Sequence, residues 1–469
     1  MTDIKMTSVN FKSLKEFVFN SFMAMGLNKI DAEIFSDALM FSELRFQSGQ
    51  GQGVQRITTY YKRIKNKEVN INAECEIIKE SSSLALIDAK NGIGTVQASK
   101  CMDIAINKAK KEGIGKVIIK NSTHFGSSSV HAVKATKQNC IGVVYTNAGP
   151  EMAPWGSKSG GVGTNPWGIS CPTDKGFPLI LDIALTTAGK GMMRWHEREN
   201  KPMPNDWAIT KDGYETTNPS EAMDGFLLGI GQYKGYGLSF MTDVLTGVIS
   251  GGGYGLMPYS DPKKLDVSHS LTAINIDWFM EITEFYKRID DFVSTIKKLP
   301  LRPDFDEIFV PGEIENKRVE EKMKFGIPLD DEVILSFEEL AEFHRISKKI
   351  KESKLFDLRP MSEKQKQRYA TLKEKMELHE KLENNYNNAK REMRKYLKNK
   401  IAEKIKEYPV NNHNAFEESY IVSGENFKVK VSEYFISEEP KDRPDSGYSS
   451  SSFSLELRNT KGDISSIGR

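Results

Sequence analysis

The sequence has few cysteines, and their arrangement builds neither a disulfide framework nor a zinc site. Its 469 residues include four, Cys75, Cys101, Cys140 and Cys171, which are widely spaced and form no CxxC pair. Small secreted domains need dense disulfides, and structural zinc sites need closely spaced thiolates. The spacing argues against both classes and predicts a protein of a reducing compartment, the cytoplasm.

Long apolar runs and metal-ligand motifs are also missing. No eighteen apolar residues follow one another, and the N-terminal stretch MTDIKMTSVNFKSLKEF carries charges where a signal peptide has its apolar centre. The seven histidines form no HExxH motif. We therefore expect no membrane span and no metal site.

Neither sign of charge is in excess, because 66 Lys and Arg face 64 Asp and Glu. The balance indicates no polyanionic partner for the whole chain. Residues 347–408 differ, with 19 basic against 10 acidic residues and a net charge of +9. Charges of both signs alternate there and aromatic residues are sparse, so nucleic-acid binding is a weaker interpretation than a solvated helix face.

Hydrophobic periodicity predicts an α/β domain behind a helical entry. Helices are expected at 11–26 and around 32–41, then strands from 83, at 116–120 and at 141–146, alternating with helices at 95–111 and 131–135. The stretch from 149 to 168 is rich in Gly and Pro and contains two tryptophans, which predicts an ordered loop. A buried strand, FPLILDIA, follows and ends near Asp182.

The C-terminal part differs from the rest in composition and in the spacing of its apolar residues. Apolar positions between 369 and 405 recur with a period of 3.6, which favours one long amphipathic helix over a coiled coil. Beyond it, YIVSGENFKVKVSEYFI predicts a β-hairpin and PKDRPDSGYSSSSFS a disordered tail. We expect four parts: a helical part at 1–80, an α/β region at 81–346, a basic helix at 347–408, and a hairpin with tail at 409–469.

No GxGxxG follows a predicted strand, which argues against a Rossmann fold. Five other motifs occur in order: THFGSSS (123–129), TNAGPEMAPWGSKSGGVGTNPWGIS (146–170), LDIA (181–184), YKGYGLSFMTDVLTGVISG (233–251) and VPGEIENKR (310–318). Together they resemble the malate/L-lactate dehydrogenase family over about residues 10–346. The resemblance implies a non-Rossmann cofactor domain on a largely antiparallel or mixed sheet, a homodimer, and hydride transfer between NAD or NADP and a small 2-oxo or 2-hydroxy acid.

The stretch SGQGQGVQR (48–56) is similar to the family segment LRGxDSHGVxR. Through this resemblance Arg56 becomes the expected clamp for the substrate carboxylate, since its guanidinium fork matches a carboxylate. Tyr60 and Thr164 are implied as further substrate contacts. The segment is two residues longer than the family pattern, and Gly51 with Gln52 stands where the family has Ser and His.

This replacement removes a proton donor. A carboxamide does not exchange protons usefully near pH 7, so Gln52 can only hydrogen-bond the substrate oxygen. His124, which matches the histidine of the family's HFG motif, remains the candidate for proton transfer. Two functions stay open: an active oxidoreductase, favoured by the other motifs, and a catalytically impaired family member that acts as a cofactor-binding or scaffold protein.

The resemblance also implies a set of cofactor contacts. The expected helix start after Phe125 could present amides to a phosphate, and Lys234 is either a phosphate partner or a solvated lysine. The sequence does not separate NAD from NADP. The implied cofactor contacts are His124, Phe125, Gly126, Ser127, Asp182, Ile183, Ala184, Tyr233, Lys234, Pro311, Gly312 and Glu313.

Overall fold

The computed structural model describes residues 6–46, 52–302, 305–330 and 333–337, and the backbone of four strands between 416 and 468. The chain divides into two compact units, Met1–Leu358 and Arg359–Arg469. The first unit contains every residue of the expected site.

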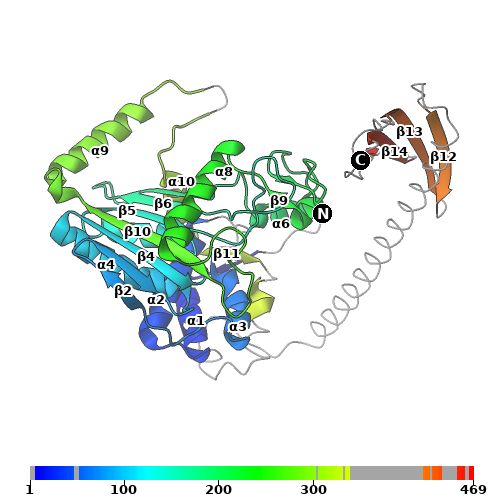
Figure 1. Ribbon diagram of the computed structural model, residues 1–469. Coiled ribbons are helices and arrows are strands. Elements are labelled where there is room, and N and C mark those ends of the chain that lie inside the picture. The colour runs from blue at the N-terminus through cyan, green and yellow to red at the C-terminus, as the bar shows by residue number, and fades with distance from the viewer. Residues whose placement is uncertain are drawn as a thin grey trace, which may run out of the picture. The chain divides into compact units, whose positions relative to one another are not determined.

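A seven-stranded sheet forms the centre of the first unit (Figure 1). All neighbouring strands are antiparallel except β3 and β4, which are parallel and joined by helix α4 (Gly94–Glu112), the crossover that a parallel pair requires. The predicted mixed sheet is thus confirmed. In spatial order the strands are β2 (Glu76–Glu80), β3 (Leu84–Asp88), β4 (Ile114–Ser122), β10 (Val267–Asn275), β5 (Cys140–Thr146), β6 (Trp167–Cys171) and β7 (Leu179–Ile183).

Helices cover both faces of this sheet. On one face α4 and α5 (Ser128–Thr136) pack on a core that includes Ile119 of β4 and Leu271 of β10. Successive side chains of a strand point to opposite faces, and Lys120, next to Ile119, lies against Gly252. The other face is therefore covered by α8 (Tyr233–Asp243), the π-helical turn η2 (Val244–Val248) and the glycine-rich turn after it.

A second core lies around the N-terminal helices α1 (Phe11–Ala24), α2 (Lys29–Arg45) and α3 (Ile57–Lys65). Asparagines cap two of them: the Asn10 carboxamide accepts from the Lys12 amide at 2.9 Å, and that of Asn28 from the Asp31 amide at 2.9 Å. Strand β1 (Met6–Val9) pairs with β11 (Ile327–Asp330), and Phe337 is fully buried in the same core. The expected boundary at residue 80 therefore does not separate two cores, because the chain returns to the first helices after residue 326.

The remaining elements surround these two cores. Helix α9 has no buried residue, and Figure 1 shows it projecting from the body. The elements outside the two cores are η1 (Val54–Arg56), α6 (Lys190–Arg198), β8 (Ala208–Ile209), α7 (Pro219–Asp224), β9 (Phe226–Leu227), η3 (Ile276–Trp278), α9 (Ile282–Lys297) and α10 (Glu313–Phe325). In the described part of the chain, no helix combines the length and apolarity that crossing a membrane requires.

The second unit contains a four-stranded antiparallel sheet of β12 (Phe416–Val422), β13 (Glu425–Phe435), β14 (Ser452–Asn459) and β15 (Ile464–Gly468). Strands β12 and β13 pair where the sequence predicted a hairpin. The tail differs from the expected disorder in that β14 and β15 extend the sheet; apolar residues alternate in the sequence SFSLEL, which is typical of a strand. The helix expected at 347–408 lies outside the described residues.

Candidate active site

Tyr60 and His124, separated by 64 residues in sequence, meet in the structure. Tyr60 lies on α3, is 1% exposed, and places its hydroxyl 3.0 Å from Nδ1 of His124 and 3.3 Å from the His124 carbonyl oxygen. His124 follows the end of β4 and is half-buried. Arg56 ends η1, one helical turn before Tyr60. The structure thus brings together three residues that the sequence analysis selected.

The contacts of His124 fix its tautomer. The Gly126 amide donates to Nδ1 at 3.2 Å, so the proton of a neutral ring lies on Nε2. Burial, with the nearby charges of Arg56 and Arg63, lowers the pKa of His124 well below its ordinary value of 6.5. His124 is therefore neutral at pH 7 and offers Nε2–H as a hydrogen-bond donor.

Arginines and tyrosines make the surroundings of this pair positive. Burial lowers the pKa of Arg56; Tyr60 and Tyr259 oppose this shift, while Arg63 and Arg194 add to it. The Arg63 guanidinium lies 5.9 Å from the centre of the Tyr60 ring and 5.5 Å from that of Tyr259. Its Nη1 is buried and has no hydrogen-bond partner among the described residues. Such a cluster favours an anionic ligand.

The sequence analysis missed Arg63 and Tyr259. A signal for Arg63 was present, because positions 56, 60 and 63 follow the i, i+4, i+7 spacing of one helix face. Tyr259 comes from a loop 199 residues beyond Tyr60, and no sequence pattern connects the two.

An aromatic stack holds the segment that bears His124. The Phe125 ring stacks on His269 at 4.6 Å and contacts His131 at 4.8 Å, while Nε2 of His131 lies 2.8 Å from the Phe125 carbonyl. Both nitrogens of His269 have partners: Thr146 Oγ1 at 2.7 Å and Ser122 Oγ at 2.8 Å. Phe125 is 1% exposed, so it anchors His124 and does not line a ligand cavity.

Replacing His269 by glutamine is expected to flatten the acid dependence of stability. Burial lowers the pKa of His269 to about 3, whereas an unfolded histidine titrates near 6.5. Below pH 6.5 the unfolded chain therefore binds a proton that the folded chain does not, and the free energy of unfolding falls by up to about 1.4 kcal/mol per pH unit until about pH 3. Urea unfolding of both proteins between pH 7 and pH 4 measures the difference; parallel curves would contradict it.

Asp182, expected at the cofactor, caps helix α5. Its carboxylate accepts from the Ser129 amide at 2.9 Å and from the Ser129 hydroxyl and the Ser128 amide. Burial raises the pKa of Asp182 to about 6. These amides are thus already occupied, so the expected phosphate site at this helix start is not open. The Ser127 hydroxyl contacts that of Ser42 at 2.9 Å, which joins α5 to α2.

The other expected cofactor residues divide into two groups. Ile183 ends strand β7 and Ala184 follows it. The Pro311 carbonyl accepts from the Ile180 amide of the same strand at 3.1 Å, so the turn at Pro311 and Gly312 lies against β7 at Ile180. The left-handed Gly312 (φ 85°) makes the turn into α10, where Glu313 pairs with Lys297. The second group, Tyr233 and Lys234, is exposed in the first turn of α8.

Thr164 lies beside the first of these groups, because its carbonyl accepts from the Leu185 amide at 2.8 Å. The loop around it is ordered as predicted: Asn165 bonds the Ala148 amide at 2.9 Å and Asp243 at 3.2 Å. Gln52 lies two residues before η1, and its Oε1 is buried without a hydrogen-bond partner among the described residues. A buried acceptor of this kind requires a donor, which a ligand hydroxyl can supply.

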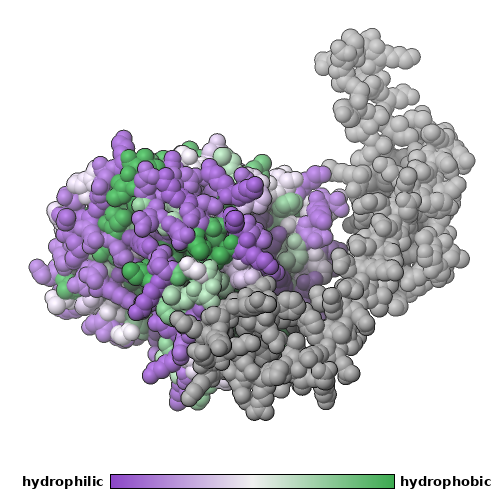
Figure 2. Space-filling view, turned by 90° about the horizontal axis from the view of Figure 1, so that it is seen from below, coloured by the Kyte–Doolittle hydropathy of each residue, from purple (hydrophilic) through white to green (hydrophobic). Residues whose placement is uncertain are grey.

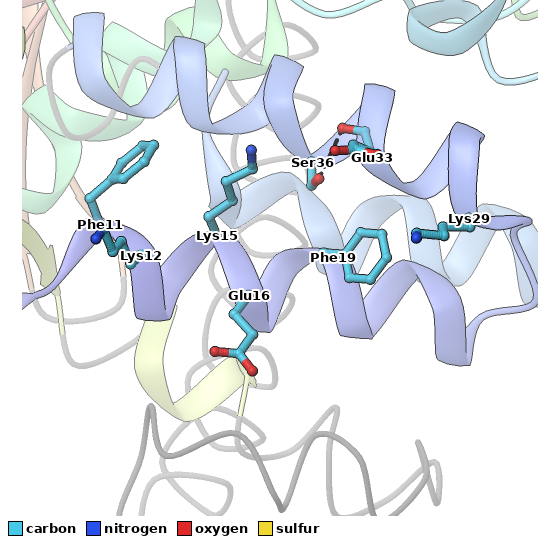
Figure 3. Close-up of a pocket in the computed structure, with 8 residues that line it drawn as sticks. All are labelled: Phe11, Lys12, Lys15, Glu16, Phe19, Lys29, Glu33 and Ser36. Carbon is cyan, nitrogen blue, oxygen red and sulfur yellow. Dashed lines mark hydrogen bonds between the residues drawn. The ribbon is translucent and has the colours of Figure 1, made fainter.

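In the part of the chain that the structure describes, no three His, Cys, Asp or Glu side chains converge as a metal site. A separate surface cavity of about 300 Å³ runs along α1 and α2. Figure 3 shows its lining side chains, which come from these two helices and include none of the site residues: Phe11, Lys12, Lys15, Glu16, Phe19, Lys29, Glu33 and Ser36.

Comparisons with known proteins show which family the chain resembles. The model of the family described as malate/L-lactate dehydrogenase matches residues 9–338. A malate dehydrogenase of Pyrococcus abyssi is 35% identical over 337 residues, which cover 70% of this chain and 92% of that protein. An L-sulfolactate dehydrogenase of Methanocaldococcus jannaschii is 32% identical over 70% of this chain and 94% of that protein.

A solved structure, the malate dehydrogenase of Entamoeba histolytica, superposes with a TM-score of 0.71 and 29% identity over 73% of this chain and 99% of that one. The family prediction is therefore confirmed, and with the mixed sheet, the missing Rossmann motif and the clustered Tyr60 and His124, the chain belongs to the malate/L-lactate dehydrogenase family of oxidoreductases.

Proposed function

We propose that this protein interconverts a 2-oxo acid and a 2-hydroxy acid with NAD or NADP. The observation that supports this most is the Tyr60–His124 pair, 3.0 Å apart and beside the charge of Arg56. A reductase of this kind needs a carboxylate clamp and a donor for the developing alkoxide. Arg56 fits the first requirement and Nε2–H of His124 the second.

The bound nicotinamide supplies a hydride to the carbonyl carbon of the substrate. Arg56 holds the substrate carboxylate, and the neutral His124 donates Nε2–H to the carbonyl oxygen. As that oxygen gains negative charge it takes the Nε2 proton, while the Tyr60 hydroxyl transfers its proton to Nδ1, 3.0 Å away. The ring ends neutral with its proton on Nδ1, and the guanidinium groups of Arg56 and Arg63 stabilise the Tyr60 oxyanion until a proton from solvent restores the hydroxyl. Oxidation runs through the same steps in reverse.

For the substrate we propose an acid with a second anionic group, such as a dicarboxylate or a sulfonated acid. Arg63 lies seven residues after Arg56 on the same helix face, about 10 Å along the axis. Its buried and unpartnered Nη1 supports this choice, because a donor there is satisfied by a second carboxylate or sulfonate. The names malate and L-sulfolactate dehydrogenase of the relatives point to acids of this class.

The cofactor site that we propose lies along the end of β7 and the start of α10. Asp182, Ile183 and Ala184 would hold the cofactor from β7, and Pro311, Gly312 and Glu313 from the turn that bonds this strand at Ile180. His124 would lie beside the reacting ring. Phe125, Gly126 and Ser127 support it from the loop after β4. Tyr233 and Lys234 extend the site on α8, where Lys234 is exposed and free to approach a phosphate.

We also propose that the protein is a homodimer of the cytoplasm. Exposed apolar side chains continue along α8 and η2, where Phe240 and Met241 are each 51% exposed and Ile249 is 60% exposed. Apolar surface of this extent is typical of an interface, and Figure 2 shows apolar patches within a hydrophilic face. All four cysteines are free thiols, which fits a reducing compartment.

The missing motif histidine supports one alternative, a family member that binds the cofactor with little turnover. Titrating NADH and NADPH fluorescence against the protein, and then measuring oxidation of the bound cofactor by oxaloacetate, sulfopyruvate and pyruvate, separates the two functions. Binding with turnover supports the oxidoreductase, binding alone supports the alternative, and binding of neither cofactor refutes both.

A further inference from the structure

Helix α3, which bears Tyr60 and follows the Arg56 turn, begins without a cap of its own. Its preceding turn η1 starts after Gly53, a residue that has no side chain to accept from the first amides. The Val54 amide instead donates to Oε2 of Glu43 at 2.9 Å, from the last turn of α2. We infer that Glu43 is a positioning residue that caps η1 from a distance and holds Arg56 at the substrate carboxylate; this rests on the proposed function.

The fit of Glu43 against Gly53 supports this role. A Cβ at Gly53 would lie 1.9 Å from Oε2 and 3.1 Å from Cα of Glu43, so no other residue fits while the carboxylate keeps its place. Gly53 has φ −91° and ψ −150°, which any residue adopts. Space for Glu43, and not backbone freedom, therefore requires glycine at this position.

Lys322 of α10 anchors the other end of the loop. Its Nζ donates to the carbonyls of Glu43 at 2.6 Å and Phe46 at 2.9 Å. Burial raises the pKa of Glu43, and the charge of Lys322 opposes this shift most strongly. A carboxylate at a helix N-terminus is further stabilised by the helix dipole. Glu43 thus connects the two ends of the loop: the end of α2 before Phe46, and Val54 at the start of η1.

This arrangement explains how the clamp tolerates a lengthened loop. The loop between Phe46 and Gln52 is two residues longer than the family pattern and lacks its histidine. The contacts that place Arg56 lie outside this stretch: the Glu43 carboxylate on Val54, and the Arg56 amide on the Gly53 carbonyl at 3.1 Å. We therefore expect changes inside the loop to leave the position of Arg56 unaltered.

Glu43→Met tests the role of Glu43, with Glu43→Gln and Glu33→Met for comparison. Methionine removes the acceptor, glutamine keeps one for the Val54 amide, and Glu33 is exposed on the same helix. In the NADH complex we expect Glu43→Met to weaken oxamate, a carboxylate probe, and to raise KM for oxaloacetate, both about tenfold, as for the loss of a helix cap. Glu43→Gln stays within about threefold of the native protein, Glu33→Met is unchanged, and NADH affinity is the same in all.

Hydrogen exchange separates this inference from the proposed function. If peptide 52–60 loses protection in Glu43→Met and in neither of the other variants, the positioning role is supported, whether or not the native protein binds oxamate. Failure of the native protein to bind oxamate would refute only the proposed function. Unchanged protection overturns the inference.

The steric fit gives a second test through Gly53→Ala. In the native background alanine collides with Glu43, and we expect a loss of oxamate affinity similar to that of Glu43→Met. In Glu43→Ala the collision with the carboxylate is absent and only the 3.1 Å approach to Cα of residue 43 remains, so adding Gly53→Ala costs at most about twofold more. Additive losses would show that Glu43 does not act through Gly53 and Val54, and would overturn the inference.

Discussion

His124→Ala is expected to slow reduction of the 2-oxo acid by about 10²–10⁴-fold, the usual contribution of a positioned proton donor. Nε2–H of His124 bonds the substrate oxygen most strongly when that oxygen becomes an alkoxide, so the loss falls on kcat. KM and the affinity for NADH should change little. Stopped-flow measurement of NADH oxidation gives the rate of the chemical step.

Tyr60→Phe tests the proton relay of the same pair. Removing the hydroxyl leaves the ring against Phe35, 4.5 Å away, but removes the donor to Nδ1. We expect kcat to fall nearly as far as in His124→Ala and the double variant to be no slower, because the two residues act as one unit. Tyr286→Phe, on α9, is the control. A Tyr60→Phe protein with native kcat would contradict the relay and leave water as the proton source.

Arg56→Met is expected to raise KM for every 2-oxo acid by roughly 10- to 150-fold, because a charge-assisted contact to a carboxylate contributes about 1.5–3 kcal/mol. Arg63→Met should raise KM by a similar factor for oxaloacetate and sulfopyruvate but leave pyruvate within about twofold. The contrast arises because only the first two acids have a second anionic group. Steady-state kinetics with the three acids measures it.

Arg288→Met, an exposed arginine of α9, controls for the loss of positive charge. If Arg63→Met weakens NADH and leaves all three acids unaffected, Arg63 binds a cofactor phosphate and the proposed second clamp is wrong. If Arg56→Met weakens cofactor and acid equally, Arg56 supports the fold and does not bind substrate.

Local pattern predicted the elements whose apolar residues alternate or repeat regularly. The helix expected at 95–111 is Gly94–Glu112, and the strand expected at 141–146 is Cys140–Thr146. The central strand β10 was missed because its sequence, VSHSLTAIN, is half polar. Its polar side chains are buried, and His269 is satisfied by tertiary partners, Thr146 and Ser122. A single sequence does not reveal such partners.

The site shows the same limit. Resemblance to the family selected Arg56, Tyr60 and His124, but the hydrogen bond between the last two, and the Gly126 amide that sets the ring tautomer, depend on tertiary structure. The phosphate site expected at α5 failed for a related reason, because Asp182 takes the amides from a strand 53 residues away. The contact between Glu43 and Gly53, ten residues apart, could likewise not be predicted, because no sequence periodicity indicates it.

Because β11 and Phe337 pack against the first helices, the N-terminal core cannot be completed until these late residues have been synthesised. The Ser8 hydroxyl donates to the carbonyl of Phe325, 317 residues later, and β1 has its partner only in β11. A nascent chain on the ribosome therefore holds α1 to α3 with an unfinished core until β11 and Phe337 emerge. This core is therefore completed only after residue 337 of 469 has been made, later than the strands of the central sheet.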